Sequence, residues 1–257
     1  MAFIHIAIEG ISGSGKTDLG SLLEKPPLVF SFTRGIEFPE GVPEVKFFRE
    51  RADQNPFLKD FYESGMKESF AYASQMFYLN ARFVTNMNIK SYPGIALEDR
   101  SIYGDLLFAR NLYEMGKLSK EAFNEYCRHR DSIMKIYGIK EPDGIIFLDI
   151  NVDTCLNERL KKRKTGEALD YDYWGRLINE YRQEFRTLSE KIPTIWIDAN
   201  TDFLKNENYV RNVTRKANNL LKRIIEKRKR EESIVQEKLP LEDIKRPIST
   251  AIQKPLL

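Results

Sequence analysis

The chain has 257 residues, of which 42% are hydrophobic and 31% are charged. This balance is typical of a soluble protein, and the length allows one α/β domain or two small ones. No apolar run approaches the roughly 20 residues that span a bilayer, which argues against a membrane protein. The stretch Lys222–Leu257 holds ten Lys/Arg and six Asp/Glu, so the remaining chain has a net charge of −1. A nearly neutral body argues against nucleic acid as a partner.

Cysteine and histidine are scarce. The chain has Cys127, Cys155, His5 and His129, with no metal-binding spacing and no disulfide framework, which indicates a reducing compartment and argues against a zinc site. A strand pattern and a glycine-rich motif occupy the first 20 residues, so we expect no signal or transit peptide and a cytoplasmic location.

Strands that are apolar throughout alternate with helical patterns along the chain. Strands are predicted at 3–8, at either 28–32 or 45–48, and at 94–99, 144–150 and 194–199. Helices are predicted at 16–24, 56–62, 67–89, 103–115, 119–137, 152–164, 171–191 and 207–232. Continuously apolar strands separated by helices indicate an α/β fold with a five-stranded parallel sheet covered by helices on both faces.

The pattern changes after Lys222. A charged helix continues first, and about the last 25 residues hold three prolines, no aromatic residue and no clear period. We therefore divide the chain into a domain at 1–221 and a charged helix end with a disordered or loosely docked tail at 222–257. The basic run resembles a nucleic-acid or membrane contact, but a solvated helix end is the more common meaning of such a run.

The stretch "IEGISGSGKTDLG" (8–20) fits the phosphate-binding pattern G-x-x-x-x-G-K-[ST]. A strand precedes it and a helix follows it, which is the context that supports the motif over a ligand-free turn. Its glycines let backbone N–H groups turn toward a phosphate at the helix N-terminus. The motif predicts a nucleoside triphosphate but leaves open whether a protein, a nucleotide, a nucleoside or water receives the phosphate. The residues expected to bind the triphosphate are Gly10, Gly13, Ser14, Gly15, Lys16 and Thr17.

Two further segments carry polar side chains suited to an acceptor. Asp99 ends the third strand and is placed to hold Mg²⁺, while Arg100 beside it could stabilise a transferred phosphoryl group. Alone, such a pair is often a surface salt bridge. Gln75 and Arg82 lie seven residues apart on one helix and so share a face. An amide and a guanidinium there could read a planar base, although a core helix with a solvated edge remains the alternative.

Six segments occur in a fixed order along the chain: "GISGSGKT" (10–17), "NPFLKDFY" (55–62), "QMFYLNAR" (75–82), "EDRSIYGD" (98–105), "RLKKR" (159–163) and "IDANTDF" (197–203). In this order they resemble the deoxynucleoside kinase family, which includes deoxycytidine, deoxyguanosine and bacterial deoxyadenosine kinases. The resemblance covers about residues 3–220. It implies a P-loop kinase fold with an Arg-containing lid, usually a homodimer, that transfers the γ-phosphoryl of ATP to the 5′-hydroxyl of a deoxynucleoside with Mg²⁺ in nucleotide salvage.

The resemblance also assigns roles. Glu50, five residues before "NP", resembles the general base that takes the 5′-hydroxyl proton. Arg100 resembles the arginine near the 5′ end of the sugar, and Lys16 the lysine on the phosphates. Asp99 and Thr17 resemble the magnesium ligands. The remaining assignments are Gln75 on the base edge, Tyr62 and Glu167 on the 3′-hydroxyl, Arg159 and Arg163 in the lid, and Asp202 and Phe203 at the adenine of ATP.

Arg82 and Asp105 resemble a pair that accompanies cytidine and purine deoxynucleosides in the family and is absent from thymidine-preferring members. An ion pair at the end of the pocket offers donors and acceptors and crowds a thymine methyl group. The resemblance therefore predicts dA, dC or dG over thymidine.

The match departs from the family in three places. The insertion at 25–44 leaves Glu37, Glu40 and Glu44 as alternatives to Glu50 for the general base. The lid reads "RKTGE" (163–167), without the usual second arginine; a lysine there cannot form a bidentate fork, so slower turnover is expected. Tyr62 lies farther from the base-reading helix than usual, so its register is open.

Two other functions remain alternatives. A nucleoside monophosphate kinase similar to thymidylate kinase also has a P-loop and an Arg-rich lid, but its acceptor pocket must bind a phosphate. A non-catalytic relative that keeps the fold as a structural subunit has no physical need for this set of charged residues.

Overall fold

The computed structural model describes residues 4–36, 43–162, 167, 169–202 and 205–238. Within them, five parallel strands form one sheet in the order β2-β3-β1-β4-β5. The predicted fold class is confirmed, and β1, which carries the P-loop, lies at the centre. The strands are β1 (Ile4–Glu9), β2 (Val45–Phe48), β3 (Ile95–Asp99), β4 (Gly144–Asp149) and β5 (Thr194–Asp198).

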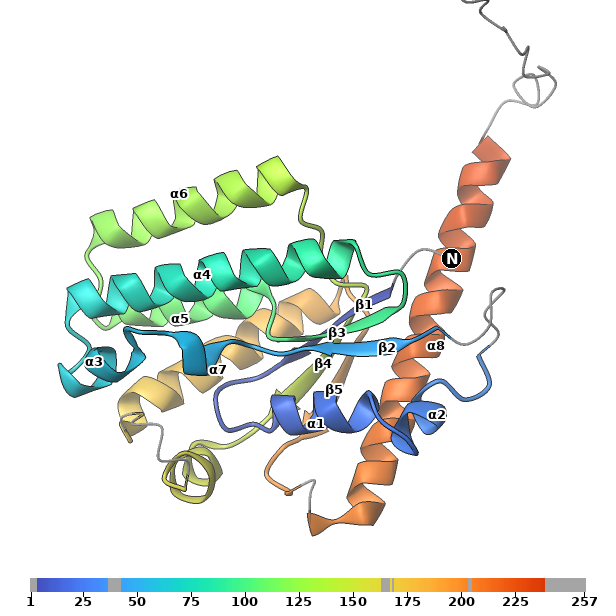
Figure 1. The fold of residues 1–257 in the computed structure, drawn as a ribbon, viewed down its shortest axis with the longest axis horizontal. Coiled ribbons are helices and arrows are strands. Elements are labelled where there is room, and N and C mark those ends of the chain that lie inside the picture. Colours follow the sequence, from blue (N-terminus) through green and yellow to red (C-terminus); the bar gives the residue numbers. More distant parts are fainter. Residues whose placement is uncertain (1–3, 37–42, 163–166, 168, 203–204, 239–257) are drawn as a thin grey trace, which may run out of the picture.

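Helices cover both faces of this sheet (Figure 1). On one face α1 packs against β1, β2 and β3, and α8 packs against β4 and β5. On the other face lie α4, α5 and α7, with α6 outside α4 and α5. The helices are α1 (Lys16–Leu23), α2 (Leu28–Phe32), α3 (Leu58–Glu63), α4 (Glu68–Lys90), α5 (Ile102–Glu114), α6 (Lys120–Tyr137), α7 (Tyr171–Ser189) and α8 (Glu207–Lys238). Two shorter turns are a 3₁₀ helix at Ala52–Gln54 and a π-helix, η2, at Thr154–Leu160.

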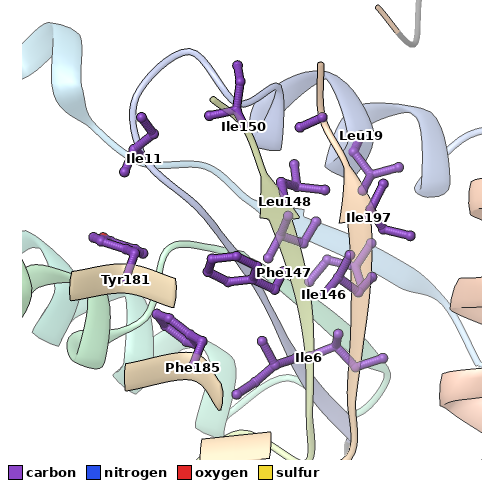
Figure 2. Close-up of a cluster of buried hydrophobic side chains, with 14 of the residues drawn as sticks. Ile6, Ile11, Leu19, Ile146, Phe147, Leu148, Ile150, Tyr181, Phe185 and Ile197 are labelled. Carbon is purple, nitrogen blue, oxygen red and sulfur yellow. The ribbon is translucent and has the colours of Figure 1, made fainter. Parts of the chain in front are cut away.

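The core explains why the central strands are apolar at every position. Phe147 of β4 points toward Tyr181 and Phe185 of α7 (Figure 2), with 5.2 Å between the rings of Phe147 and Phe185. Ile146 lies on the opposite side of the strand, with Ile197 of β5. Because successive side chains of a strand alternate between faces, a sheet covered on both sides needs apolar residues throughout.

Of the two candidates for the second strand, 45–48 is the strand and 28–32 is the helix α2. Val45–Phe48 takes the edge position beside β3, so the sheet offers no place to the other segment. The segment around α2 docks on α8 instead, where the Asn218 side-chain amide donates to the carbonyls of Phe32 at 2.7 Å and Arg34 at 3.0 Å. Tertiary packing therefore overrides the β propensity of "LVFSF". The helix predicted at 152–164 is described as the shorter π-helix η2.

Helix α8 is longer than predicted and continues across the expected boundary at 221/222. Ile224 and Ile225 are buried on the core, and Arg228 forms an ion pair with Asp143 at 2.6 Å. The part of the helix just beyond residue 222 thus belongs to the body. Of the tail predicted over about the last 25 residues, 233–238 continue α8 instead, and 239–257 lie outside the described residues. None of the helices in the described part is long and apolar enough to cross a membrane.

Candidate active site

The P-loop connects β1 to α1 and is shaped by its glycines. Gly10, Gly13 and Gly15 have φ values of 142°, 84° and 92°, a region that side chains disfavour. A Cβ on Gly10 would lie 2.7 Å from the Leu148 carbonyl oxygen. The turn therefore exists only with glycine at these positions, and it delivers its N–H groups to the N-terminus of α1.

Lys16 is the first residue of α1 and is almost completely buried. Its Nζ donates to the Ile11 carbonyl at 3.1 Å and lies 4.0 Å from Asp99 Oδ1. Burial and the nearby Arg100 cation lower the pKa of Lys16 to about 8, against the opposing effect of Asp99. A desolvated ammonium of this kind gains much from an incoming phosphate, which would restore its charged form.

Thr17 and Asp99 form the expected place for Mg²⁺. Thr17 Oγ1 donates to Asp99 Oδ2 at 2.7 Å, while Asp99 Oδ1 is buried with no hydrogen-bond partner among the described residues. Burial holds the pKa of Asp99 above its usual range, although Lys16 lowers it. Mg²⁺ usually binds through one or two carboxylates plus phosphates and water. Thr17 and Asp99 fit this mode of Mg²⁺ binding. The described residues contain no cluster of three or more His, Cys, Asp or Glu that would enclose a metal ion with protein ligands alone.

A cavity of about 470 Å³ extends from the P-loop to the N-terminal part of α7. The residues predicted to bind the triphosphate and those predicted to bind the acceptor line it together, because the carboxyl ends of β1 and β3 meet at one edge of the sheet. Of the predicted site residues, those that line it are Gly13, Gly15, Lys16, Thr17, Glu50, Tyr62, Gln75, Arg100, Asp105 and Glu167.

Glu50 stands between two arginines at the middle of this cavity. Its Oε1 lies 2.9 Å from Arg82 Nη2 and 3.2 Å from Arg100 Nε, the second contact being a close ion pair rather than an aligned hydrogen bond. Burial would raise the pKa of Glu50, but Arg100 and Arg82 outweigh it and hold the pKa below its usual range. The carboxylate is therefore ionised and able to accept a proton. Of the alternatives in the insertion, Glu44 is not among the lining residues, and Glu37 and Glu40 lie outside the described residues.

Arg82 and Asp105 form the predicted ion pair, and it is bidentate. Arg82 Nε and Nη2 lie 3.1 and 3.3 Å from the two Asp105 oxygens, and Nη1 donates to the Asp99 carbonyl at 2.6 Å. Arg82 is 2% exposed and stands behind Asp105, which lines the cavity together with Gln75. Arg82 thus holds Asp105 and Glu50 in one arrangement.

The π-helix η2 packs directly against the P-loop. A Cβ on Gly13 would lie 3.1 Å from the Arg159 Cβ, so Arg159, predicted to be a lid arginine, begins beside the P-loop. Arg159 forms an ion pair with Asp202 at 3.2 Å, which connects η2 to the loop after β5. Arg163 and Phe203, also predicted here, lie outside the described residues.

Several residues that line the cavity were not predicted from the sequence: Asn55, Ser74, Tyr78, Phe108 and Tyr173. Asn55 Nδ2 donates to Ser74 Oγ at 2.9 Å and so joins the loop before α3 to α4. Tyr78 lies one helical turn after Gln75, and Phe108 one turn after Asp105, so helical spacing could have found both. Tyr173 comes from α7, and nothing local in the sequence points to it.

Comparisons with known proteins identify the family and the fold. A family model described as deoxynucleoside kinase matches residues 6–222. The chain is 30% identical over 195 residues to a deoxyadenosine kinase of Dictyostelium discoideum, covering 76% of this chain and 71% of that protein. It is 28% identical over 211 residues to a deoxyguanosine kinase of Lactobacillus johnsonii, covering 79% and 85%. The solved structure of deoxyadenosine kinase from M. mycoides with bound dCTP has the same fold, with a TM-score of 0.65 at 20% identity over 83% of this chain and 98% of that one. The chain belongs to the deoxynucleoside kinase family.

Proposed function

We propose that this protein transfers the γ-phosphoryl of ATP to the 5′-hydroxyl of a deoxynucleoside, with dA, dC and dG favoured over thymidine, in cytoplasmic nucleotide salvage. The observation that carries the proposal is the continuity of one cavity from Lys16 in the P-loop through Glu50 and Arg100 to Gln75 and Asp105. A phosphate donor and a hydroxyl acceptor can occupy such a cavity together, which is the main requirement of phosphoryl transfer.

The chemistry follows from the charges around Glu50. Its ionised carboxylate accepts the proton of the 5′-hydroxyl as the oxygen attacks phosphorus. Arg100 and Lys16 stabilise the charge on the transferred group and on the leaving diphosphate. Thr17 and Asp99 would hold Mg²⁺, which would supply further neutralisation of the phosphate oxygens. Tyr62 and Glu167 are proposed to hold the sugar.

Selectivity for the base is assigned to Gln75 and to Asp105 with Arg82 behind it. An amide and a carboxylate can pair with base edges that carry an amino group, and the ion pair leaves little space for a thymine methyl. The double variant with Arg82→Met and Asp105→Ala is expected to raise thymidine phosphorylation relative to dA by at least about tenfold, the value of one good polar contact. An unchanged ratio of kcat/KM for the two substrates contradicts this assignment.

The reaction is tested with purified protein, Mg²⁺–ATP and each of dA, dC, dG, dT and dTMP. We expect product from dA, dC or dG, and a Glu50→Gln control slower by about 10²–10⁴-fold. Activity that survives in this control moves the general base to the insertion at 25–44. Product from dTMP alone favours a monophosphate kinase, and no product from any acceptor favours a structural role.

We also propose a homodimer, as the family resemblance implies. Light scattering of the purified protein is expected to give twice the chain mass of 30.1 kDa. A mass near that of one chain at assay concentration contradicts the proposal.

A further inference from the structure

Arg100 has a backbone conformation that side chains rarely adopt. Its φ is 67°, in the left-handed region, where a non-glycine residue is strained unless its surroundings hold it. It directly follows Asp99, the last residue of β3, and its N–H donates to the Ile8 carbonyl at 3.0 Å. The turn swings the side chain into the cavity beside Glu50. Something outside the local sequence must therefore keep Arg100 in this state.

Glu9 at the end of β1 provides two of the contacts that do so. Its Oε1 accepts hydrogen bonds from the Ser101 backbone N–H at 2.7 Å and from Ser101 Oγ at 2.5 Å. Both donors belong to the residue directly after Arg100, so the peptide that follows the strained residue is fixed in orientation. Glu9 is 0% exposed and does not line the cavity. Burying a carboxyl group here costs free energy that an apolar residue would avoid, which points to a purpose beyond folding.

The Arg100 side chain is held from further elements. Arg100 Nη1 donates to the Tyr181 hydroxyl at 3.2 Å, and that hydroxyl donates to the Gly104 carbonyl at 3.0 Å. The guanidinium lies 4.2 Å from the ring centroid of Phe108. With Glu50 as its third neighbour, the Arg100 side chain has one defined position. The hydrogen bonds of Glu9 to Ser101 fix the backbone next to Arg100. The contacts with Tyr181 and Phe108 fix the direction of the Arg100 side chain.

We propose that Glu9 is a positioning residue for phosphoryl transfer: by holding Ser101 it keeps Arg100 in the left-handed conformation that places the guanidinium against Glu50 and the transferred group. The inference rests on the proposed function for its kinetic part. Glu9 acts only through Arg100, so its loss is expected to affect the chemical step rather than nucleotide binding.

Two substitutions at Glu9 separate its hydrogen bonds from its charge. Glu9→Gln keeps a carbonyl oxygen that accepts both bonds, whereas Glu9→Ala removes them. We expect kcat to fall at least about tenfold in Glu9→Ala and to stay within about threefold in Glu9→Gln, because a displaced arginine costs catalysis far more than its neighbour's charge does. The Kd for ATP should change by less than about threefold in both. A loss in Glu9→Ala that appears only as weaker ATP binding, or equal losses in both variants, overturns the proposal.

A matched control removes a similar pair of bonds far from the cavity. Asn218→Ala deletes the two contacts to the carbonyls of Phe32 and Arg34 and is expected to lower the melting temperature while kcat is kept. If Asn218→Ala reduces kcat as much as Glu9→Ala does at similar stability, the effect of Glu9 is general destabilisation. If Glu9→Ala does not fold, Ser101→Ala serves as a milder variant, because it deletes only the hydrogen bond from the Ser101 hydroxyl. A kcat of Ser101→Ala equal to that of the wild type then counts against the proposal.

A crystal structure of the Glu9→Ala or Ser101→Ala protein tests the geometry without any assay. We expect Arg100 to leave the left-handed region, or its guanidinium to move away from the 3.2 Å contact with Glu50. An Arg100 with unchanged φ and an unchanged contact refutes the proposal. A wild-type protein that phosphorylates no deoxynucleoside defeats the proposed function, and this structural comparison then decides the role of Glu9 by itself.

Discussion

Gly104 offers a sharp test of how closely Arg100 is packed. A Cβ added at this position would lie 2.7 Å from the Tyr181 hydroxyl, 2.8 Å from Arg100 Cγ and 2.8 Å from Glu9 Oε2. Ordinary contact begins near 3.4 Å, so Gly104→Ala forces at least several tenths of an ångström of movement among three groups that are already fixed. One of these groups is the arginine proposed to stabilise the transferred phosphoryl.

The size of the effect follows from two opposing contributions. Replacing glycine by alanine inside a helix stabilises the folded state by about 1 kcal/mol. Overpacking a full core destabilises it by about 1–3 kcal/mol. We therefore expect Gly104→Ala to be neutral or destabilised by up to about 2 kcal/mol. A displacement of Arg100 of this size should lower kcat by about 10- to 100-fold.

The matched control is Gly175→Ala on α7, where a Cβ meets no described atom within 4 Å beyond its own helix and chain neighbours. It should raise the melting temperature by about 2–4 °C, as expected for 1 kcal/mol in a domain of this size, and leave kcat unchanged. Calorimetry and steady-state kinetics on both variants make the comparison. A Gly104→Ala protein with the stability gain of Gly175→Ala and wild-type kcat would refute the close packing around Arg100.

Two further predictions concern stability. Burial and the neighbouring Glu114 raise the pKa of Glu180 to about 7, so the folded state binds this proton more tightly and loses stability as pH rises from about 4.5 to 7. Glu180→Gln should therefore raise the melting temperature at pH 8 but not at pH 5. The control Glu184→Gln, which breaks the ion pair with Arg110, should not raise the melting temperature at either pH. A gain in Glu180→Gln that is equal at both pH values contradicts the reasoning. Gly20→Ala places a Cβ 2.2 Å from the Phe47 ring and is expected to lower the melting temperature by several degrees, and an unchanged value would mean that the ring moves freely.

The sequence by itself was sufficient for the α/β class, four of the five strands and the P-loop. These features rest on local signals: continuous apolar runs for doubly covered strands, and glycines at positions where only a residue without a Cβ fits. Helical spacing was also sufficient to place Gln75 and Arg82 on one face, and their surroundings were then supplied by α5 and β3. The choice between 28–32 and 45–48 was not local, because both segments suit a strand and only one edge position beside β3 existed.

Only the tertiary structure decided what holds Arg100. Glu9 and Ser101 lie 92 positions apart, and Tyr181 reaches the same arginine from α7 across 81 positions. No period or motif in a single sequence links such residues, because their contact depends on the parallel register of β1 with β3 and on the packing of α7 over the sheet. The proposed reacting groups could thus be named from the sequence. The fold determined the side chains that hold them in place, since positioning is a property of contacts between elements rather than of any one segment.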